Sequence, residues 1–102
     1  MKNIELKDLF GGNCYHICTN GQETPTIIMD MEDYRVATNY IALAAWKTGI
    51  DILVYIIMSN HIHILVVCND RSLATKYIRL FKRLYSTHLL HKYNMSDALL
   101  GI

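Results

Sequence analysis

The chain has 102 residues, of which 52% are hydrophobic and 19% are charged, and its formal net charge at pH 7 is +1. This length and apolar content suit one compact domain, residues 1–102, with a single core and no linker or repeat to divide it. The longest apolar stretch is interrupted by Asn60, His61 and His63, and no basic-then-apolar segment opens the chain, so we expect no membrane span and no signal peptide but a cytoplasmic protein.

Residues 14–19 alternate as a β-strand does, and a short extended piece follows at residues 26–29. One face of the first strand holds Tyr15 and Ile17, and the other holds Cys14, His16 and Cys18. The three cysteines of the chain are odd in number and nothing indicates secretion, so we expect them to be reduced thiols.

A helix is predicted from Asp30 to about Thr48. Asp30 is a favourable N-cap residue, and Glu32 and Asp33 place negative charge in the first turn, where the helix dipole favours it. Gly49 is well placed to end the helix, because glycine adopts the left-handed conformation of that position without strain. These capping signals define both ends of the helix.

Two further strands are predicted at residues 50–58 and 61–68, both rich in β-branched side chains. Only Ser59 and Asn60 separate them, and both residue types favour turns. We therefore expect a hairpin in which the two strands are antiparallel neighbours.

The second strand of this hairpin opens with two histidines. Side chains alternate across a strand, so His61 and His63 point to one face while Ile62 and Ile64 point to the other, where a core would receive them. Imidazole is a common ligand for divalent transition metals, and two ligands on a rigid strand form half of a metal site. The competing interpretation is that each histidine is a hydrogen-bonded structural residue.

Two kinds of metal site are compatible with the histidine pair. One is a hard-metal site that adds an oxygen or nitrogen ligand from elsewhere in the fold, and the other is a softer zinc site that adds Cys14 or Cys18. The zinc site requires the first strand to lie beside the third, which would also bring His16 near the pair. The spacing of the two cysteines is not that of a zinc knuckle, and small thiols in strands are usually buried.

A second long helix is predicted from about Ser72 to Tyr93. Its apolar stripe is predicted at Leu73, Tyr77, Leu80, Leu84 and His88. Residues 71–102 contain six basic residues and one acidic residue, a net charge of +5, whereas residues 1–70 carry four basic and eight acidic residues, a net charge of −4. The cations of this helix that we predict to contact nucleic-acid phosphates are Lys76, Arg79, Lys82 and Arg83. The alternative is a helix face that is charged for solubility alone.

The order of elements, strand-helix-strand-strand-helix, predicts an α+β fold with a ferredoxin-like antiparallel sheet and helices on one face. The other face of the sheet is then open to solvent or ligand, and the histidines can occupy it.

The run from Tyr55 to Val67 resembles the signature of the HUH single-tyrosine transposases of insertion sequences and of their REP-associated relatives. In that signature an aromatic and apolar residues precede Met, Pro, Asn, His, an apolar residue and His. Residues 14–21, 30–34 and 72–94 resemble the first strand, the entry to the first helix and the helix after the histidine strand of that family. The resemblance covers about residues 10–95.

The resemblance implies a ferredoxin-like domain that cuts single-stranded DNA, usually beside a hairpin, through a tyrosine nucleophile and a 5′-phosphotyrosine intermediate. His61 and His63 would then bind Mg²⁺ or Mn²⁺, and Asn60 would shape the turn before them. The implied partners are single-stranded or hairpin DNA and a second copy of the chain, because family members are commonly dimers.

The chain departs from the family pattern at two places. Ser59 stands where proline is usual, which keeps the turn chemistry. The chain ends at Ile102, before the helix that carries the nucleophile and often a third metal ligand in the family. Tyr85 is the remaining candidate nucleophile, although a tyrosine in such a helix usually packs in the core.

We therefore expect the metal-binding and DNA-binding part of a DNA transposase whose tyrosine helix is missing. Without that helix an apolar surface would be bare, and we expect the chain to self-associate. The alternative function is a module derived from such an enzyme that binds hairpin nucleic acid without cutting it.

Overall fold

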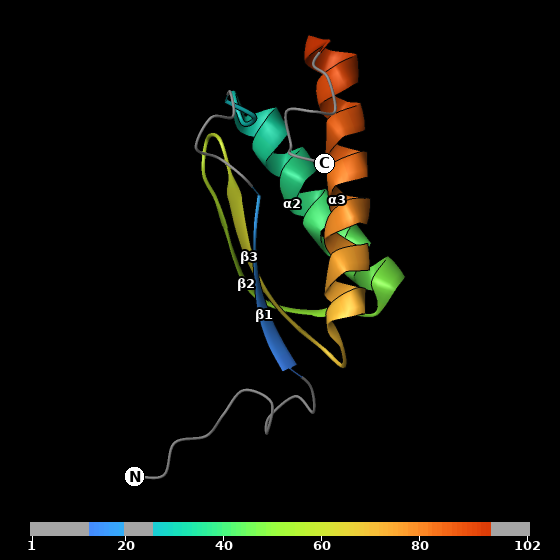
Figure 1. The fold of residues 1–102 in the computed structure, drawn as a ribbon. Helices are drawn as coiled ribbons and strands as arrows, with labels where there is room; N and C mark the ends of the chain where they lie inside the picture. The colour runs from blue at the N-terminus through green and yellow to red at the C-terminus, as the bar shows by residue number, and fades with distance from the viewer. Residues whose placement is uncertain (1–12, 20–25, 95–102) are drawn as a thin grey trace, which may run out of the picture.

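The computed structural model describes residues 13–19 and 26–94 of the chain. Its elements are β1 (Asn13–Cys18), α2 (Met31–Thr48), β2 (Asp51–Ile57), β3 (Ile62–Cys68) and α3 (Arg71–Tyr93). The three strands form one antiparallel sheet in the order β1-β3-β2, and both helices lie against the same face of it (Figure 1). This arrangement confirms the predicted α+β class, with helices on one face of an antiparallel sheet.

The predicted hairpin of β2 and β3 is confirmed. Ile57 is paired with Ile62, and the backbone N–H of Met58 donates to the carbonyl of His61 at 2.8 Å. The pairing shifts by one residue between Ile52 and Val54, which marks a bulge in β2. The strand that we predicted over residues 61–68 begins one residue later, so His61 closes the turn and His63 lies in β3.

Both helices begin and end with capping groups. The Asp30 carboxylate accepts a hydrogen bond from the backbone N–H of Asp33 at 2.9 Å, and Gly49 ends α2 with a φ of 73°, as the sequence predicted. Asp70 caps α3 by accepting from the backbone N–H of Leu73, and Asn94 ends it in the left-handed conformation.

The core lies between the sheet and the two helices. From β3 it takes Ile62, Ile64 and Val66, none of which has any exposed surface. From α3 it takes Ala74, Tyr77, Phe81, Tyr85 and Leu89.

The stripe that we predicted for α3 was therefore partly wrong. Tyr77 is buried as predicted, but Phe81 and Tyr85 are buried where Leu80 and Leu84 were expected, and these leucines are only half-buried. The physical reason is that α3 packs against α2 as well as against the sheet. The side chains that face both are the ones excluded from water, and a pattern read from one helix does not show where its neighbour lies.

Candidate metal site and nucleic-acid surface

His61 and His63 lie together at the turn between β2 and β3. Their ring centroids are 4.8 Å apart and the rings are nearly perpendicular, at 77°. Both side chains are half-buried, whereas Ile62 and Ile64 are fully buried on the helix side of the sheet. The alternation of the strand therefore directs the imidazoles and the isoleucines to opposite sides, as the sequence predicted.

A hydrogen bond from the turn fixes the orientation of one histidine. The Nδ1 atom of His61 lies 2.7 Å from the Oδ1 atom of Asn60. Because an amide oxygen only accepts hydrogen bonds, His61 donates through Nδ1 and keeps a lone pair on Nε2 in its neutral form. A metal ion binds an imidazole nitrogen through such a lone pair.

The neighbouring strand brings a third histidine to this face. Cys18 of β1 is paired with His63 across the sheet, and His16 lies two residues before Cys18. The Nε2 atom of His16 is 2.9 Å from the Nδ1 atom of His63, and the two rings stack with centroids 5.1 Å apart. We call the sheet face that carries His16, Cys18 and His63 the open face, because the described helices lie on the other side.

The thiol of Cys18 lies beside this group. Its sulfur is 3.9 Å from the Nε2 atom of His63, and the thiol donates to the carbonyl of Thr19 at 3.3 Å. Within residues 13–19 and 26–94, however, the cysteines and histidines of this face do not bring three ligand atoms within 4.8 Å of one another. A complete zinc site is therefore not assembled there, while two imidazoles fit half of a divalent-metal site.

A different group of ligand-type side chains meets at the other end of the helices. Ligand atoms of Glu32, Asp33 and His88 lie within 4.8 Å of one another. The Lys92 ammonium already occupies this position, at 2.7 Å from Asp30, 2.7 Å from Glu32 and 3.1 Å from Asp33. With Tyr93, which also donates to Asp33, these residues form what we call the Asp33 cluster. The sequence pattern does not indicate this cluster, because its residues at the start of α2 and its residues near the end of α3 are more than 50 positions apart.

Asp33 is fully buried in this cluster. Burial alone would raise the pKa of its carboxyl group, but hydrogen bonds from Tyr93, from His88, from the backbone N–H of Met29 and from Lys92 together hold that pKa well below its usual range. The desolvation of Lys92 is likewise outweighed, and its bonds to Asp30 and Glu32 raise the pKa of its ammonium group. The cluster therefore supplies its own cation and joins α2 to α3.

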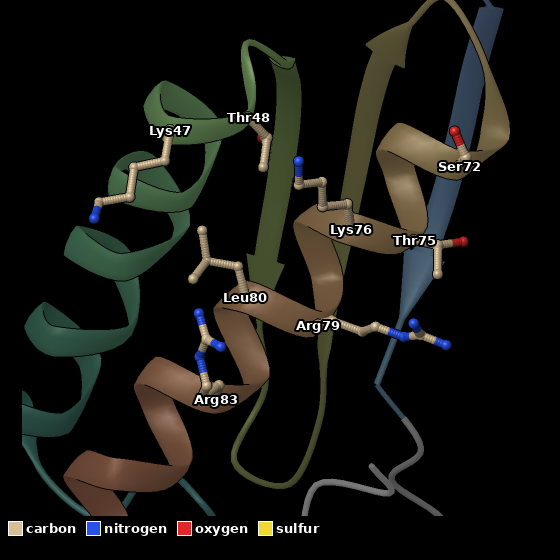
Figure 2. Close-up of a pocket in the computed structure, with 8 residues that line it drawn as sticks. All are labelled: Lys47, Thr48, Ser72, Thr75, Lys76, Arg79, Leu80 and Arg83. Carbon is tan, nitrogen blue, oxygen red and sulfur yellow. The ribbon is translucent and has the colours of Figure 1, made fainter.

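A groove with a volume of about 690 Å³ lies between the C-terminal end of α2 and the N-terminal half of α3 (Figure 2). We call it the basic groove, and its lining consists of Lys47, Thr48, Ser72, Thr75, Lys76, Arg79, Leu80 and Arg83. Three of the four predicted DNA-binding cations line the groove, and Lys47 of α2 is a fourth cation that the charge pattern of α3 did not predict. A charge pattern on one helix cannot show what a second helix contributes to the same surface.

The cations of the basic groove spread along it instead of converging. In Figure 2 the Arg83 side chain lies between the two helices, whereas those of Lys47 and Arg79 extend in opposite directions. Among the described residues, no acidic side chain forms an ion pair with any of the groove cations. Such a spread suits several phosphates of one polyanion better than a single small anion.

Lys82 is separate from these cations. It is half-buried and does not line the groove, and its desolvation lowers the pKa of its ammonium group. The four cations that we predicted to contact phosphates are therefore divided: Lys76, Arg79 and Arg83 line the groove, and Lys82 lies outside it.

None of the seven tyrosines of the chain lies on the open face. Tyr15 and Tyr55 are paired with Val66 and Ile64, so their side chains lie on the helix side of the sheet, and the other five belong to the helices. Tyr85 is fully buried, and its hydroxyl donates to the carbonyl of Ile27 at 2.6 Å. Burial raises the pKa of Tyr85, with a further contribution from the Asp33 charge, so it has the environment of a core residue.

Among the described residues, neither helix combines the length and the apolar composition that crossing a membrane requires. A search of curated proteins finds no match.

The comparison with solved structures finds a related fold. The crystal structure of a putative transposase from Deinococcus radiodurans R1 superposes with a TM-score of 0.66 at 12% sequence identity. The match covers 81% of this chain and 63% of that one, so the chain spans less than two thirds of its structural neighbour. At this identity the likeness concerns the fold alone.

The family comparison covers most of the sequence. Residues 12–101 match the model of the family described as "Transposase IS200 like". This range includes β1, both histidines and the whole of α3. The chain therefore belongs to the IS200-like transposase family.

Proposed function

We propose that this chain is the metal-binding and DNA-binding part of a transposase that cuts and rejoins single-stranded DNA beside a hairpin through a 5′-phosphotyrosine intermediate. The observation that carries the proposal is the pair formed by His61 and His63 on the open face. Their ring centroids are 4.8 Å apart, and the Nδ1 atom of His61 is hydrogen-bonded to Asn60. The donor set fits a divalent ion as two of its ligands, and the remaining ligands come from DNA, water or another segment.

His61 and His63 would hold Mg²⁺ or Mn²⁺. When bound, such an ion stabilises negative charge on the oxygens of the scissile phosphate. The two imidazoles fix its position relative to the sheet, because they project from a paired strand and from the turn that precedes it. The basic groove would hold other phosphates of the same DNA through Lys76, Arg79 and Arg83.

The nucleophilic tyrosine, in this proposal, belongs to a segment other than residues 1–102, in the same subunit or in a second one. Its absence from the open face follows from the positions of all seven tyrosines of the chain. Val54 and Ile56 lie next to the histidines on this face, because they are paired with Leu65 and His63, and about half of the surface of each is exposed. An apolar surface beside two metal ligands suits a covering element that brings the nucleophile with it.

We also propose that the chain forms a homodimer, with the apolar part of the open face contributing to association. Val54, Ile56 and Met58 are all exposed by 45% or more. Sedimentation velocity should show a concentration-dependent dimer, and a monomer at every concentration tested would contradict this part of the proposal.

The test of the metal site compares His61→Ala and His63→Ala with His91→Ala, which replaces an exposed histidine of α3 outside both sites. Mn²⁺ affinity, measured by electron paramagnetic resonance of the free ion, should fall at least about tenfold in the first two variants and stay unchanged in the third. Equal affinity in all four proteins, or no binding by any, would overturn the metal site.

The nucleophile is tested with labelled single-stranded hairpin DNA and Mn²⁺. We expect metal-dependent binding without a denaturation-resistant protein–DNA adduct. An adduct that peptide mapping places on Tyr85, or on any other tyrosine of the chain, would show that the nucleophile is not external.

A second candidate function is a module that binds hairpin nucleic acid without cutting it. The observation that favours it is the combination of a basic groove without acidic partners and an open face without a tyrosine, both among the described residues. For such a module, His61→Ala and His63→Ala would leave DNA affinity unchanged with or without Mn²⁺, and only substitutions in the groove would lower it.

A further inference from the structure

The Nδ1 atoms of both candidate ligands are engaged by side chains. Asn60 Oδ1 lies 2.7 Å from Nδ1 of His61, and His16 Nε2 lies 2.9 Å from Nδ1 of His63. We propose that Asn60 and His16 are positioning residues that hold the two histidines in the tautomer protonated at Nδ1, so that both Nε2 lone pairs are available to one divalent ion. This inference rests on the proposed metal site and assigns two residues to its support.

The case of His61 follows from the chemistry of its partner. A neutral imidazole carries one proton, on either Nδ1 or Nε2, and a short contact to an amide oxygen is favourable only when the facing nitrogen carries it. Asn60 therefore selects the tautomer with Nδ1–H. Because Asn60 belongs to the turn that precedes β3, the orientation of the ligand is fixed by the hairpin itself.

The hydrogen bond between His63 and His16 has two possible arrangements, because either imidazole can donate the proton. If the His63 Nδ1–H donates to His16 Nε2, then His63 has a lone pair on Nε2 and can bind a metal. In the reverse arrangement the proton of His63 is on Nε2 and faces the sulfur of Cys18, 3.9 Å away. Sulfur is a weak acceptor at that distance, so little opposes the first arrangement, and binding of a metal at Nε2 requires it.

His16 is suited to accept this hydrogen bond. It is exposed on the edge strand β1, so in the first arrangement the proton on its own Nδ1 can be hydrated. Its ring is parallel to that of His63, with an interplanar angle of 2°, which limits rotation of the ligand. His16 contacts the nitrogen of His63 that a metal bound at Nε2 would leave free, so its role is to orient the ligand.

We expect the loss of His16 to lower metal affinity as much as the loss of other residues that orient metal ligands, which is typically about 10- to 100-fold. The test measures Mn²⁺ affinity, again by electron paramagnetic resonance, for wild type, His16→Leu and His16→Gln. His16→Leu should weaken binding by about tenfold or more, because it removes the acceptor. His16→Gln should restore most of the affinity, because the amide oxygen of glutamine can accept the same hydrogen bond.

The matched control is Cys14→Ala, a substitution of an exposed residue on the same strand and the same face, two positions from His16. It should leave Mn²⁺ affinity unchanged. Circular dichroism spectra of all variants should coincide with that of wild type, because His16 is exposed and outside the core.

A second measurement does not depend on metal binding. Nitrogen-15 NMR of the imidazole rings in the metal-free protein at alkaline pH reports which nitrogen carries the proton. We expect Nδ1–H for His61 and His63, and a mixture of tautomers for His63 in His16→Leu.

The outcomes separate the two proposals. If wild type does not bind Mn²⁺, the proposed metal site fails. If wild type binds Mn²⁺ but His16→Leu binds it equally well, or if NMR finds His63 protonated at Nε2 in both proteins, the metal site stands and the positioning role of His16 is overturned.

Discussion

The two ends of the layer formed by α2 and α3 carry charge in opposite ways. At one end, the Asp33 cluster surrounds one ammonium group with three carboxylates, and a histidine and a tyrosine complete the hydrogen bonds of its buried member. At the other end, the cations of the basic groove have no acidic partner among the described residues. The comparison indicates that charge at the first end holds helices together, while charge at the second is available to a ligand.

The largest effect on the free energy of unfolding is expected at the buried carboxylate of Asp33. Asp33→Ala should lower the free energy of unfolding by about 3 kcal/mol or more, because it leaves the partners of a buried charge uncompensated. Urea unfolding followed by circular dichroism measures this difference. Glu32→Ala removes an exposed contact of the same ammonium group and should cost less than about 1 kcal/mol. Equal effects of the two substitutions would contradict a structural role for the buried end.

The same end should show a specific dependence on pH. The pKa of Asp33 is lowered in the folded protein, so below about pH 4 the unfolded chain binds a proton that the folded protein does not. The contribution of Asp33 to stability should therefore be constant from pH 7 to pH 5 and decline as the pH falls from about 4 toward the lower folded pKa. The difference in unfolding free energy between wild type and Asp33→Ala isolates it, and a difference that grows on acidification would contradict the assignment.

The smallest effect on stability is expected in the basic groove, where substitutions should instead weaken DNA binding. Lys76→Gln and Arg83→Gln should change the free energy of unfolding by no more than about 0.5 kcal/mol. Each should weaken binding of hairpin DNA and reduce the slope of log affinity against log salt concentration by about 1, as loss of one phosphate contact does.

Two other substitutions serve as comparisons in this experiment. Arg35→Gln removes an exposed cation of α2 that does not line the groove, and it should leave the salt dependence of DNA binding unchanged. Lys82→Gln removes the half-buried lysine of α3 and should have a smaller effect than Lys76→Gln. A loss at Arg35 as large as that at Arg83 would indicate attraction by net charge without a defined surface.

Several features of this protein are determined by the sequence alone, because they depend on neighbours in the chain. The N-cap at Asp30, the left-handed Gly49 and the hairpin around Ser59 and Asn60 are local conformational preferences, and all are present in the structure. The common direction of His61 and His63 follows in the same way from the alternation of a strand. The family is also readable from the sequence, because residues 12–101 match it.

Other features were decided only by the tertiary structure, because they depend on which elements become neighbours. Pairing of β1 with β3 brings His16 to His63, and packing of α2 on α3 joins Lys47 to the cations of α3 and Asp33 to Lys92. The same packing buries Tyr85 in place of Leu84. Strand order and helix contacts connect residues about 30 to 60 positions apart, and the short-range periodicity of a sequence contains no information about such distances.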